Sequence, residues 1–336
     1  LPLTITFSPA AKGEYFDTLL IESNDPYKPV IRIPIEGFSA TTTCGVIASD
    51  QTWTKDNSPY FITCGSFGID VGVTLTIEKG VSVYLDSARM FMVDGTLQVN
   101  GTKGEPVKFD GLFNHSFDKI HFRPGAIGNL NHMHISDANT AIYFEGNELR
   151  GNGLIVKNCN KGINAGAGSV LLDSCLVQDI SSTGIGVNCD EYAITNSEIA
   201  YNQAGIVVRG NGRLENNTIH HNSINGLYME GGMAIDNEVY DNDGIGINAE
   251  QECRIYANRI KNNASNGIDA SGCFIEDNNI AANQGIGIGG SDNEIRSNIV
   301  IQNQQDGIYS SQESIISFNK ITSNTGNGIR MEGRNE

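Results

Sequence analysis

The sequence contains an internal repeat of 20 or 21 residues, in which the pattern I-x-x-N-x-I-x-x-N is followed by G-I over seven consecutive units. Each unit has three apolar positions, and equivalent positions form three columns along the chain. The first column is Ile194, Leu214, Ala234, Ile255, Ile275, Ile295 and Ile316; the second is Ile199, Ile219, Val239, Ile260, Ile280, Val300 and Ile321; the third is Ile206, Leu227, Ile247, Ile268, Ile288, Ile308 and Ile329. A repeat of this length is typical of a solenoid, in which each unit packs only against its neighbours.

The spacing within one unit excludes a straight strand. Ile255 and Ile260 are five residues apart, so on a flat strand their side chains would point to opposite faces. Both can point inward only if the chain turns a corner between them. Asn258 lies at that corner and Asn263 at the next. Because Asn tolerates left-handed backbone geometry and bonds its local backbone, we predict that the repeated Asn residues form the corners.

The same pattern excludes a helix, because the apolar residues do not recur at intervals of three and four and because Asn and Gly disfavour helices. Such a unit instead makes one turn of a coil, and coils stacked about 4.8 Å apart pair equivalent strands. Equivalent Asn amides can then bond one another along the stack. The predicted corner and ladder residues are Asn217, Asn237, Asn258, Asn278, Asn298 and Asn319.

This repeat resembles the right-handed parallel β-helix of pectate-lyase-like proteins, and the resemblance covers roughly residues 67–336. It implies an all-β chain folded as a right-handed parallel β-helix solenoid with about 20–23 residues per coil. The segment 72–111 also resembles the first coils of secreted β-helix proteins, with alternating apolar residues such as Leu75 and Ile77 in its expected strands.

The first 40 residues alternate apolar and polar side chains between turn signals and lack the repeat. With Phe7, Pro9 and the Ser-Asn-Asp-Pro turn at 23–26, they resemble the closing half of an immunoglobulin-like module of the ASPM/SPD-2/Hydin type. We therefore expect a partial immunoglobulin-like β segment, a small β-rich appendage, at residues 1–40. Two hairpins alone are marginally stable, so this segment must lean on the β-helix, on a missing part or on a neighbouring molecule.

Residues 41–66 are predicted to be a linker and N-terminal cap, with the β-helix itself spanning residues 67–336. The formal net charge of −17 argues against nucleic-acid binding, which requires a basic surface. No run of 18 or more apolar residues is present, so we expect no insertion into a membrane. High acidity with 39 Gly suits an extracellular or cell-surface protein.

One outer face of the predicted third strand gathers acidic residues. The residues that follow each inward Ile by one and by three positions point outward, which places Glu230 and Glu250 on neighbouring coils. Arg209 then lies one coil earlier and Asp269 alongside. Like charges this close raise the pKa of one carboxyl group or attract a cation.

Polysaccharide lyases with the fold that this repeat resembles use carboxylates that hold Ca²⁺ and a basic residue that accepts a proton. The resemblance implies that Glu230, Glu250, Asp269 and Arg209 are the candidates for these catalytic roles, with Tyr228 and Asn248 as candidate substrate-binding residues. The alternative is a solvated acidic face, since the short coils supply no long loops to wall a cleft. No catalytic residue is therefore assigned, and Ca²⁺ is the one cofactor considered.

Three histidines form a second candidate site. His132 and His134 flank an inward Met133 and so share an outer face, and His121 lies about one coil earlier. Stacked imidazoles can bind Zn²⁺ or Cu²⁺, although outward polar histidines are the simpler explanation.

Four of the seven cysteines are candidates for disulfides. Cys44 and Cys64 precede the repeats and could form a bridge. Cys253 and Cys273 occupy equivalent positions in adjacent coils, within reach of each other but in an awkward in-register geometry. For this second pair a disulfide and a stack of buried thiols are both compatible with the sequence.

Two functions remain open. The chain begins inside a half module and ends on the third strand of a coil, so it is either a piece of a longer surface protein or a subunit completed by neighbouring copies. The regular short coils favour an extracellular structural or adhesive protein, with itself as partner in a head-to-tail filament. The acidic face favours the alternative, a Ca²⁺-dependent polysaccharide lyase or carbohydrate-binding protein with a cell-surface polysaccharide as partner.

Overall fold

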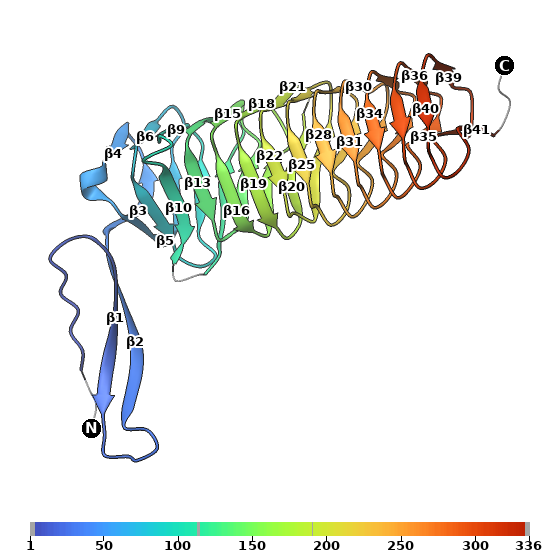
Figure 1. The fold of residues 1–336 in the computed structure, drawn as a ribbon. Helices are drawn as coiled ribbons and strands as arrows, with labels where there is room; N and C mark the ends of the chain where they lie inside the picture. Colours follow the sequence, from blue (N-terminus) through green and yellow to red (C-terminus); the bar gives the residue numbers. More distant parts are fainter. Residues whose placement is uncertain (1–3, 113–114, 190, 333–336) are drawn as a thin grey trace.

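The computed structural model describes residues 4–112, 115–189 and 191–332. Within these residues the chain consists of strands joined by short turns, together with one 3₁₀ helix, η1 (Lys55–Asn57). The strands build a long solenoid, and a two-stranded hairpin projects from its N-terminal end (Figure 1). The prediction of an all-β parallel β-helix is confirmed. None of the described helical structure is long or apolar enough to span a bilayer.

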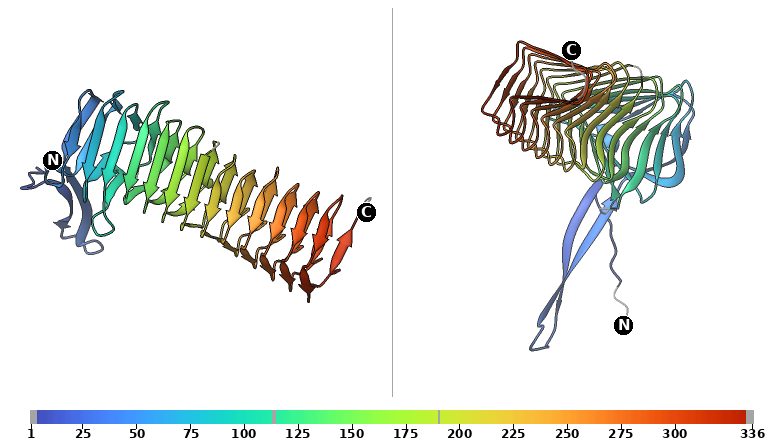
Figure 2. Two further views of the ribbon diagram at one scale, coloured as in Figure 1. Left: turned by 90° about the horizontal axis from the view of Figure 1, so that it is seen from above. Right: turned by 90° about the vertical axis from the view of Figure 1, so that its right-hand side faces the viewer.

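Three stacks of parallel strands run along the solenoid (Figure 2). The first stack consists of β7 (Ser82–Leu85), β10 (Val107–Gly111), β13 (Met133–Ser136), β16 (Ile155–Cys159), β19 (Leu176–Ile180), β22 (Glu198–Ala200), β25 (Thr218–His220), β28 (Glu238–Tyr240), β31 (Arg259–Lys261), β34 (Asn279–Ala281), β37 (Ile299–Ile301) and β40 (Lys320–Thr322).

The second stack follows the first around a corner and belongs to the same sheet. It consists of β8 (Met90–Val93), β11 (Phe117–Phe122), β14 (Ala138–Phe144), β17 (Lys161–Ala165), β20 (Thr183–Asn188), β23 (Ala204–Arg209), β26 (Leu227–Glu230), β29 (Ile247–Glu250), β32 (Ile268–Ser271), β35 (Ile288–Ser291), β38 (Ile308–Ser310) and β41 (Ile329–Met331).

The third stack forms a separate sheet that closes each coil. It consists of β4 (Gln51–Trp53), β6 (Thr74–Glu78), β9 (Thr96–Asn100), β12 (Ile127–Asn131), β15 (Glu148–Asn152), β18 (Ser169–Asp173), β21 (Glu191–Thr195), β24 (Arg213–Glu215), β27 (Met233–Ile235), β30 (Arg254–Tyr256), β33 (Phe274–Glu276), β36 (Glu294–Arg296) and β39 (Ile315–Ser317).

Equivalent residues of successive coils pair in register. Ile255 pairs with Ile275, and Ile275 pairs with Ile295, along the third stack. Ile260 and Ile268 of the same coil lie in the first and second stacks, and both are fully buried. Each such side chain contributes about 1.5–3 kcal/mol through burial. The three apolar columns read from the sequence are therefore the three walls of the core.

The corners differ from the prediction in which residue bends the chain. The left-handed conformation belongs to the residue before each ladder Asn, such as Ala257 (φ 56°) before Asn258 and Asp277 (φ 56°) before Asn278. The assignment of left-handed geometry to the Asn itself was wrong. The Asn is needed inside the corner, because only an inward amide reaches the groups that the bend exposes.

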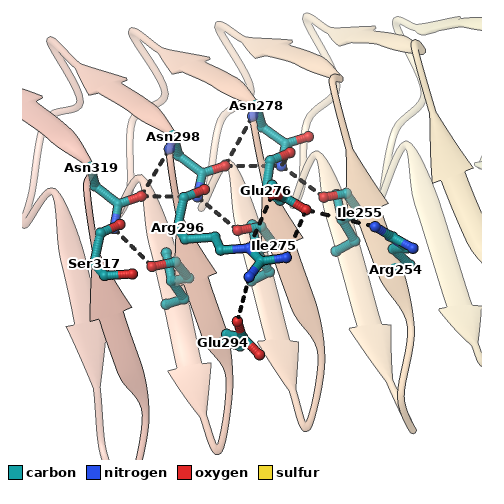
Figure 3. Close-up of polar contacts among 11 residues, drawn as sticks. Arg254, Ile255, Ile275, Glu276, Asn278, Glu294, Arg296, Asn298, Ser317 and Asn319 are labelled. Atoms are coloured by element: carbon teal, nitrogen blue, oxygen red, sulfur yellow. Dashed lines mark hydrogen bonds and ion pairs between the residues drawn. The ribbon is translucent and has the colours of Figure 1, made fainter.

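The predicted Asn ladder is present and buried (Figure 3). The Asn298 Oδ1 accepts hydrogen bonds from the Asn278 backbone N–H at 2.9 Å and from the Asn278 Nδ2 at 3.0 Å. The Asn278 Nδ2 also donates to the Ile255 carbonyl at 2.9 Å. Each amide thus satisfies main-chain groups of two neighbouring coils, which removes the cost of burying them.

A second ladder lies at the corner between the first and second stacks. Asn263, predicted as the next corner, bonds to Asn283 in the same way, through its N–H at 3.0 Å and its Nδ2 at 2.9 Å. The members of this ladder are Asn202, Asn222, Asn242, Asn263, Asn283, Asn303 and Asn324.

The N-terminal appendage is a single antiparallel hairpin of β1 (Gly13–Glu22) and β2 (Val30–Ser39). It meets the solenoid through Phe38, whose ring lies 5.6 Å from Phe61 and 5.0 Å from Tyr84. The appendage therefore packs against the β-helix, which is one of the three supports expected for it. Its kinship with an immunoglobulin-like module stays a prediction.

The segment expected to be a linker and cap contributes strands to the coils. β3 (Thr41–Ile47) pairs in parallel with β5 (Tyr60–Ile69), which in turn pairs with β7 and β8. β4 pairs in parallel with β6. Residues 41–66 thus form the first coil of the solenoid and begin the second, where Tyr60 lies in register with Thr41. Their alternating side chains bury Trp53, Ile62 and Tyr60 in the same core.

Candidate functional site

The predicted acidic face lies on the outer side of the second stack. Arg209 pairs in register with Glu230, and Glu230 pairs with Glu250. The neighbouring column holds Tyr228, followed one coil later by Asn248. The register that places these residues together follows from the inward columns, because a residue next to an inward Ile must face outward.

Three of these side chains form one contact group. The Arg209 Nε donates to the Glu230 Oε1 at 2.8 Å, and the Tyr228 hydroxyl donates to the same oxygen at 2.5 Å. The Arg209 guanidinium also lies over the Tyr228 ring, 5.5 Å from its centroid. Both donors and the ring are thereby held in fixed positions on the surface.

The electrostatics of this group differ from the prediction. The hydrogen bond from Tyr228 and the pairing with Arg209 lower the pKa of Glu230, and the same hydrogen bond raises the pKa of Tyr228 to about 12. The expectation that like charge raises the pKa of one carboxyl group on this face does not hold for Glu230, because two donors already stabilise its ionised form. The ion pair likewise raises the pKa of Arg209.

The remaining predicted residues do not join the group. Asp269 follows Asn248 in the Tyr228 column, two coils beyond Tyr228, and accepts from the Asn266 Nδ2 at 3.1 Å. Glu250 is exposed at the edge of the face. In the described part of the chain no three His, Cys, Asp or Glu side chains converge as metal ligands.

A related arrangement recurs along this face, in which the glutamate follows the tyrosine by two residues in the first two cases and lies on the next coil in the third. We call it a Tyr–Glu–cation station: a tyrosine whose hydroxyl donates to a glutamate and whose ring has a cation over it. The three stations are Tyr143 with Glu145 and Lys119, Tyr228 with Glu230 and Arg209, and Tyr309 with Glu332 and Arg330. In every station the pKa of the glutamate is lowered and that of the tyrosine is raised.

The stations are evenly spaced. Tyr143, Tyr228 and Tyr309 stand in one outward column, four coils apart in each case. At about 4.8 Å per coil, neighbouring stations are about 19 Å apart. Of the three stations, only the middle one was predicted from the sequence. The sequence signal for the other two stations is that Tyr recurs at every fourth position of this outward column. The positions between Tyr143 and Tyr228 are Asn164, Gly186 and Val207, and those between Tyr228 and Tyr309 are Asn248, Asp269 and Gly289.

The surface is hollowed between the first two stations. A depression of about 250 Å³ is lined by residues that include Lys161, Asn164, Thr183 and Gly186. A neighbouring depression of about 570 Å³ lies towards the third stack. The two share Asn188 and Arg209, so the middle station lies at their common border.

The three candidate histidines do not form one site. His121 lies on β11 in the second stack, where its Nε2 is 2.9 Å from the Glu145 Oε2, so it belongs to the first station. His134 lies on β13 in the first stack, and burial together with Lys108 and Lys157 lowers its pKa. The predicted grouping of His121 with His132 and His134 was wrong, because a corner separates β11, which carries His121, from β13, which carries His134.

The cysteine pairs behave differently. Cys44 and Cys64 form a disulfide that links β3 to β5, as expected. Cys253 and Cys273 are buried thiols, which is the second of the two expectations for that pair. Their Sγ atoms donate to the Glu250 carbonyl at 2.9 Å and to the Ser271 carbonyl at 3.3 Å.

The sequence model described as "Right handed beta helix region" matches residues 107–243, 135–273 and 214–336. The chain belongs to the right-handed β-helix family. All three Tyr–Glu–cation stations of this β-helix protein lie within the matched residues. No curated protein matches the sequence.

Among solved structures, this β-helix protein is similar to the A-module of mannuronan C-5 epimerase AlgE4 of Azotobacter vinelandii, with 12% identity over 88% of this chain and 90% of that one and a TM-score of 0.43. It is also similar to the periplasmic alginate epimerase AlgG, with 12% identity over 77% of this chain and 76% of that one and a TM-score of 0.45. For pectate lyase Pel9A the identity is 13%, the coverage 86% and 79%, and the TM-score 0.31. At such values the comparison says nothing about activity.

Proposed function

We propose that this protein binds an extended polysaccharide along the outer face of the second stack, with the polymer crossing the coils parallel to the solenoid axis. The observation that carries the proposal is the recurrence of the Tyr–Glu–cation station at every fourth coil. A binding element repeated at a fixed spacing suits a ligand that is itself periodic. Each station adds a contact, so a long polymer gains from several at once.

Each station offers the two contacts that a sugar ring needs. The Tyr228 ring provides an apolar face for the C–H groups of a pyranose, and the Glu230 carboxylate provides acceptors for its hydroxyls. Arg209 holds both of these groups in place through one ion pair and one contact over the ring. Groups held rigidly before binding lose little entropy when the ligand arrives.

The surface between stations leaves room for the polymer. Between the stations, the residues in the same column as the tyrosines have shorter side chains, including Gly186 in the first interval and Gly289 in the second. Lys161 and Arg209 also line the first depression, where they suit the carboxylate of a uronic acid. An acidic polysaccharide is therefore one form of the proposed ligand.

A lyase in which Arg209 accepts a proton is disfavoured by this geometry. The ion pair with Glu230 raises the pKa of a group that already holds its proton at neutral pH. The proposed function is accordingly binding, and cleavage is one of the outcomes that its test measures.

The test is a calorimetric titration with a uronate polymer and a neutral glucan, each as long chains and as trisaccharides. We expect Tyr228→Ala to weaken binding of the preferred long chain about tenfold. Tyr256→Ala, on the outer face of the third stack, is the matched control. Trisaccharides should bind more weakly, because they contact one station. Equal affinity for Tyr228→Ala and the unchanged protein, or no binding of either polymer, would refute the proposal.

A structural or adhesive role at the cell surface is the second candidate. The uniform coils from residue 191 onward and their continuous ladders suit a stiff rod, and a head-to-tail filament of copies is the finer form of this proposal. The Cys44–Cys64 disulfide favours an exported protein, since such bonds persist in oxidising compartments. Electron microscopy of protein isolated from its source tests both points: filaments would support assembly, and dispersed short rods would exclude it.

A further inference from the structure

The outer face of the third stack carries a depression of its own, on a different sheet from the stations. This third-stack depression has a volume of about 310 Å³ and crosses four successive coils, from β12 to β21. At about 4.8 Å per coil it is about 14 Å long. Two outward columns line it: Asn129, Arg150, Leu171 and Ala193 form one, and Asn131, Asn152, Asp173 and Thr195 form the other.

The amides in this depression are open. Asn131 and Asn152 pair in register and are both exposed, yet in the described chain neither side-chain amide hydrogen-bonds to another residue. Stacked amides elsewhere on the surface bond to each other, as the Asn160 Nδ2 does to the Asn139 Oδ1 at 3.1 Å. Asn131 and Asn152 therefore present donors and acceptors that a ligand can use.

One end of the depression holds a fixed carboxylate. The Asp173 Oδ1 accepts hydrogen bonds from the Thr195 hydroxyl at 2.6 Å and from the Asn196 Nδ2 at 2.7 Å. The Ser174 hydroxyl donates to the other oxygen at 2.9 Å. These hydrogen bonds, with that from Thr195 the strongest influence, lower the pKa of Asp173, so the group is ionised at neutral pH.

The charges of the depression favour an uncharged ligand. Arg150 is its one cation, and the Arg150 Nε already pairs with the Glu148 carboxylate. The donors that hold Asp173 are all neutral, so its negative charge faces the ligand uncompensated. A uronic acid would be repelled here, whereas Lys161 and Arg209 in the second-stack depression suit one.

The main chain of these coils is not available to a partner. β12, β15, β18 and β21 each pair with a neighbour on both sides, so an added peptide strand would find no free edge. A ligand must be recognised by side chains alone. Amides that both donate and accept match the hydroxyls of a sugar, and the half-buried Leu171 offers an apolar contact for its C–H groups.

We propose that the third-stack depression is a second saccharide site, which takes a short stretch of a neutral sugar chain. The amides of Asn131 and Asn152 would bond its hydroxyls, Asp173 would accept a further hydroxyl, and Leu171 would lie against a ring. This proposal does not depend on the polysaccharide face of the second stack, because the two surfaces belong to different sheets.

The test titrates four hexasaccharides by calorimetry: those of glucose, mannose and N-acetylglucosamine, which are neutral, and that of galacturonate. We expect at least one neutral hexamer to bind. Asn152→Ala should weaken this binding about tenfold, because the hydrogen bonds of one amide are lost. Asn279→Ala, an exposed asparagine on the first stack, is the matched control and should have no effect. The double variant Asn131→Ala/Asn152→Ala should bind more weakly still.

The variants separate this site from the polysaccharide face. Tyr228→Ala should leave binding of the neutral hexamer unchanged, and Asn152→Ala should leave binding of the galacturonate hexamer unchanged. A neutral hexamer whose binding is lost in Tyr228→Ala and kept in Asn152→Ala would overturn this proposal and leave the second-stack face standing. Binding of none of the neutral hexamers, an equal loss in Asn152→Ala and Asn279→Ala, or an equal loss for the galacturonate hexamer in Asn152→Ala would also overturn it. Circular dichroism of each variant confirms that the coils remain folded.

Discussion

The first coils and the later coils of this solenoid fill their interiors in different ways. Between residues 41 and 144 the core contains a run of aromatic rings, in which Phe91 lies 4.9 Å from Phe67 and 5.3 Å from Phe109. From residue 191 onward the interior consists of small aliphatic columns flanked by two Asn ladders.

The first and later coils also differ in how regular their lengths are. The starts of β6, β9 and β12 are separated by 22 and 31 residues, whereas later coils repeat every 20 or 21. Rings pack by contact and tolerate coils of unequal length. An amide ladder requires equivalent corners in successive coils, because each Asn must meet the same main-chain groups as the Asn before it. Polar groups buried at the corners therefore impose the regular repeat.

The largest expected effect concerns the aromatic interior. Phe91→Ala should lower the free energy of unfolding by about 4 kcal/mol, because it removes a fully buried ring and leaves a cavity. Urea unfolding measures the total loss. Hydrogen exchange should place it in the first coils, since a solenoid transmits strain only to its neighbours. Met92→Ala, whose side chain points outward, is the control, and an equal loss in both variants would contradict the role given to the ring.

The next effect concerns the ladder. Asn278→Ala should cost about 3 kcal/mol, because it leaves the Asn258 N–H and Nδ2 and the Ile255 carbonyl buried without their partner. Asn279→Ala, at an exposed neighbouring position, should have little effect. The measurement is again urea unfolding. An unchanged midpoint for Asn278→Ala would show that the ladder is incidental to the fold.

The third prediction uses pH to separate the two regions. Asp110, in the first coils, has a buried Oδ1 to which none of the described residues donates a hydrogen bond, and burial and Asp137 raise its pKa to about 6. Because this value exceeds that of an unfolded chain, the folded state holds an extra proton between about pH 4 and 6. The contribution of Asp110 to the free energy of unfolding therefore falls as pH rises through that window.

Asp110→Asn should accordingly raise the free energy of unfolding at pH 7 by about 1 kcal/mol, a figure reduced because the carboxyl group keeps some contact with solvent. At pH 4 the gain should vanish. Asp70→Asn at an exposed position serves as the control. A gain that is the same at both pH values would exclude the carboxylate as its cause. The ladder amides do not ionise, so hydrogen exchange should place the gain in the first coils.

The smallest effect is expected on the outer surface of the later coils. Arg296 bridges Glu276 and Glu294 there, with Arg254 on the other side of Glu276 (Figure 3). Arg296→Ala should leave the melting temperature nearly unchanged, because exposed ion pairs contribute little and are screened by salt. A loss as large as that of Asn278→Ala, measured at high and low salt, would mean that surface charge supports the ladder coils.

The repeat in the sequence was enough to predict the solenoid, its three inward columns and the stacking of Glu230 on Glu250. These features depend on spacing alone: residues five apart can both face inward only across a corner, and a fixed period sets the register of every coil. The ladder of Asn217 to Asn319 followed for the same reason. The similarity of successive units made these predictions possible without any knowledge of individual contacts.

The features that do not repeat from coil to coil could be seen only in the tertiary structure. It assigned the bend to residues such as Ala257, built residues 41–66 into the first two coils, and left Cys253 and Cys273 as thiols while Cys44 and Cys64 form a disulfide. It also completed the station of Arg209. The spacing of residues in the repeat shows which way a side chain points. Its contact partners could not be predicted in the same way, because they depend on the local chain conformation and on residues one or two coils away.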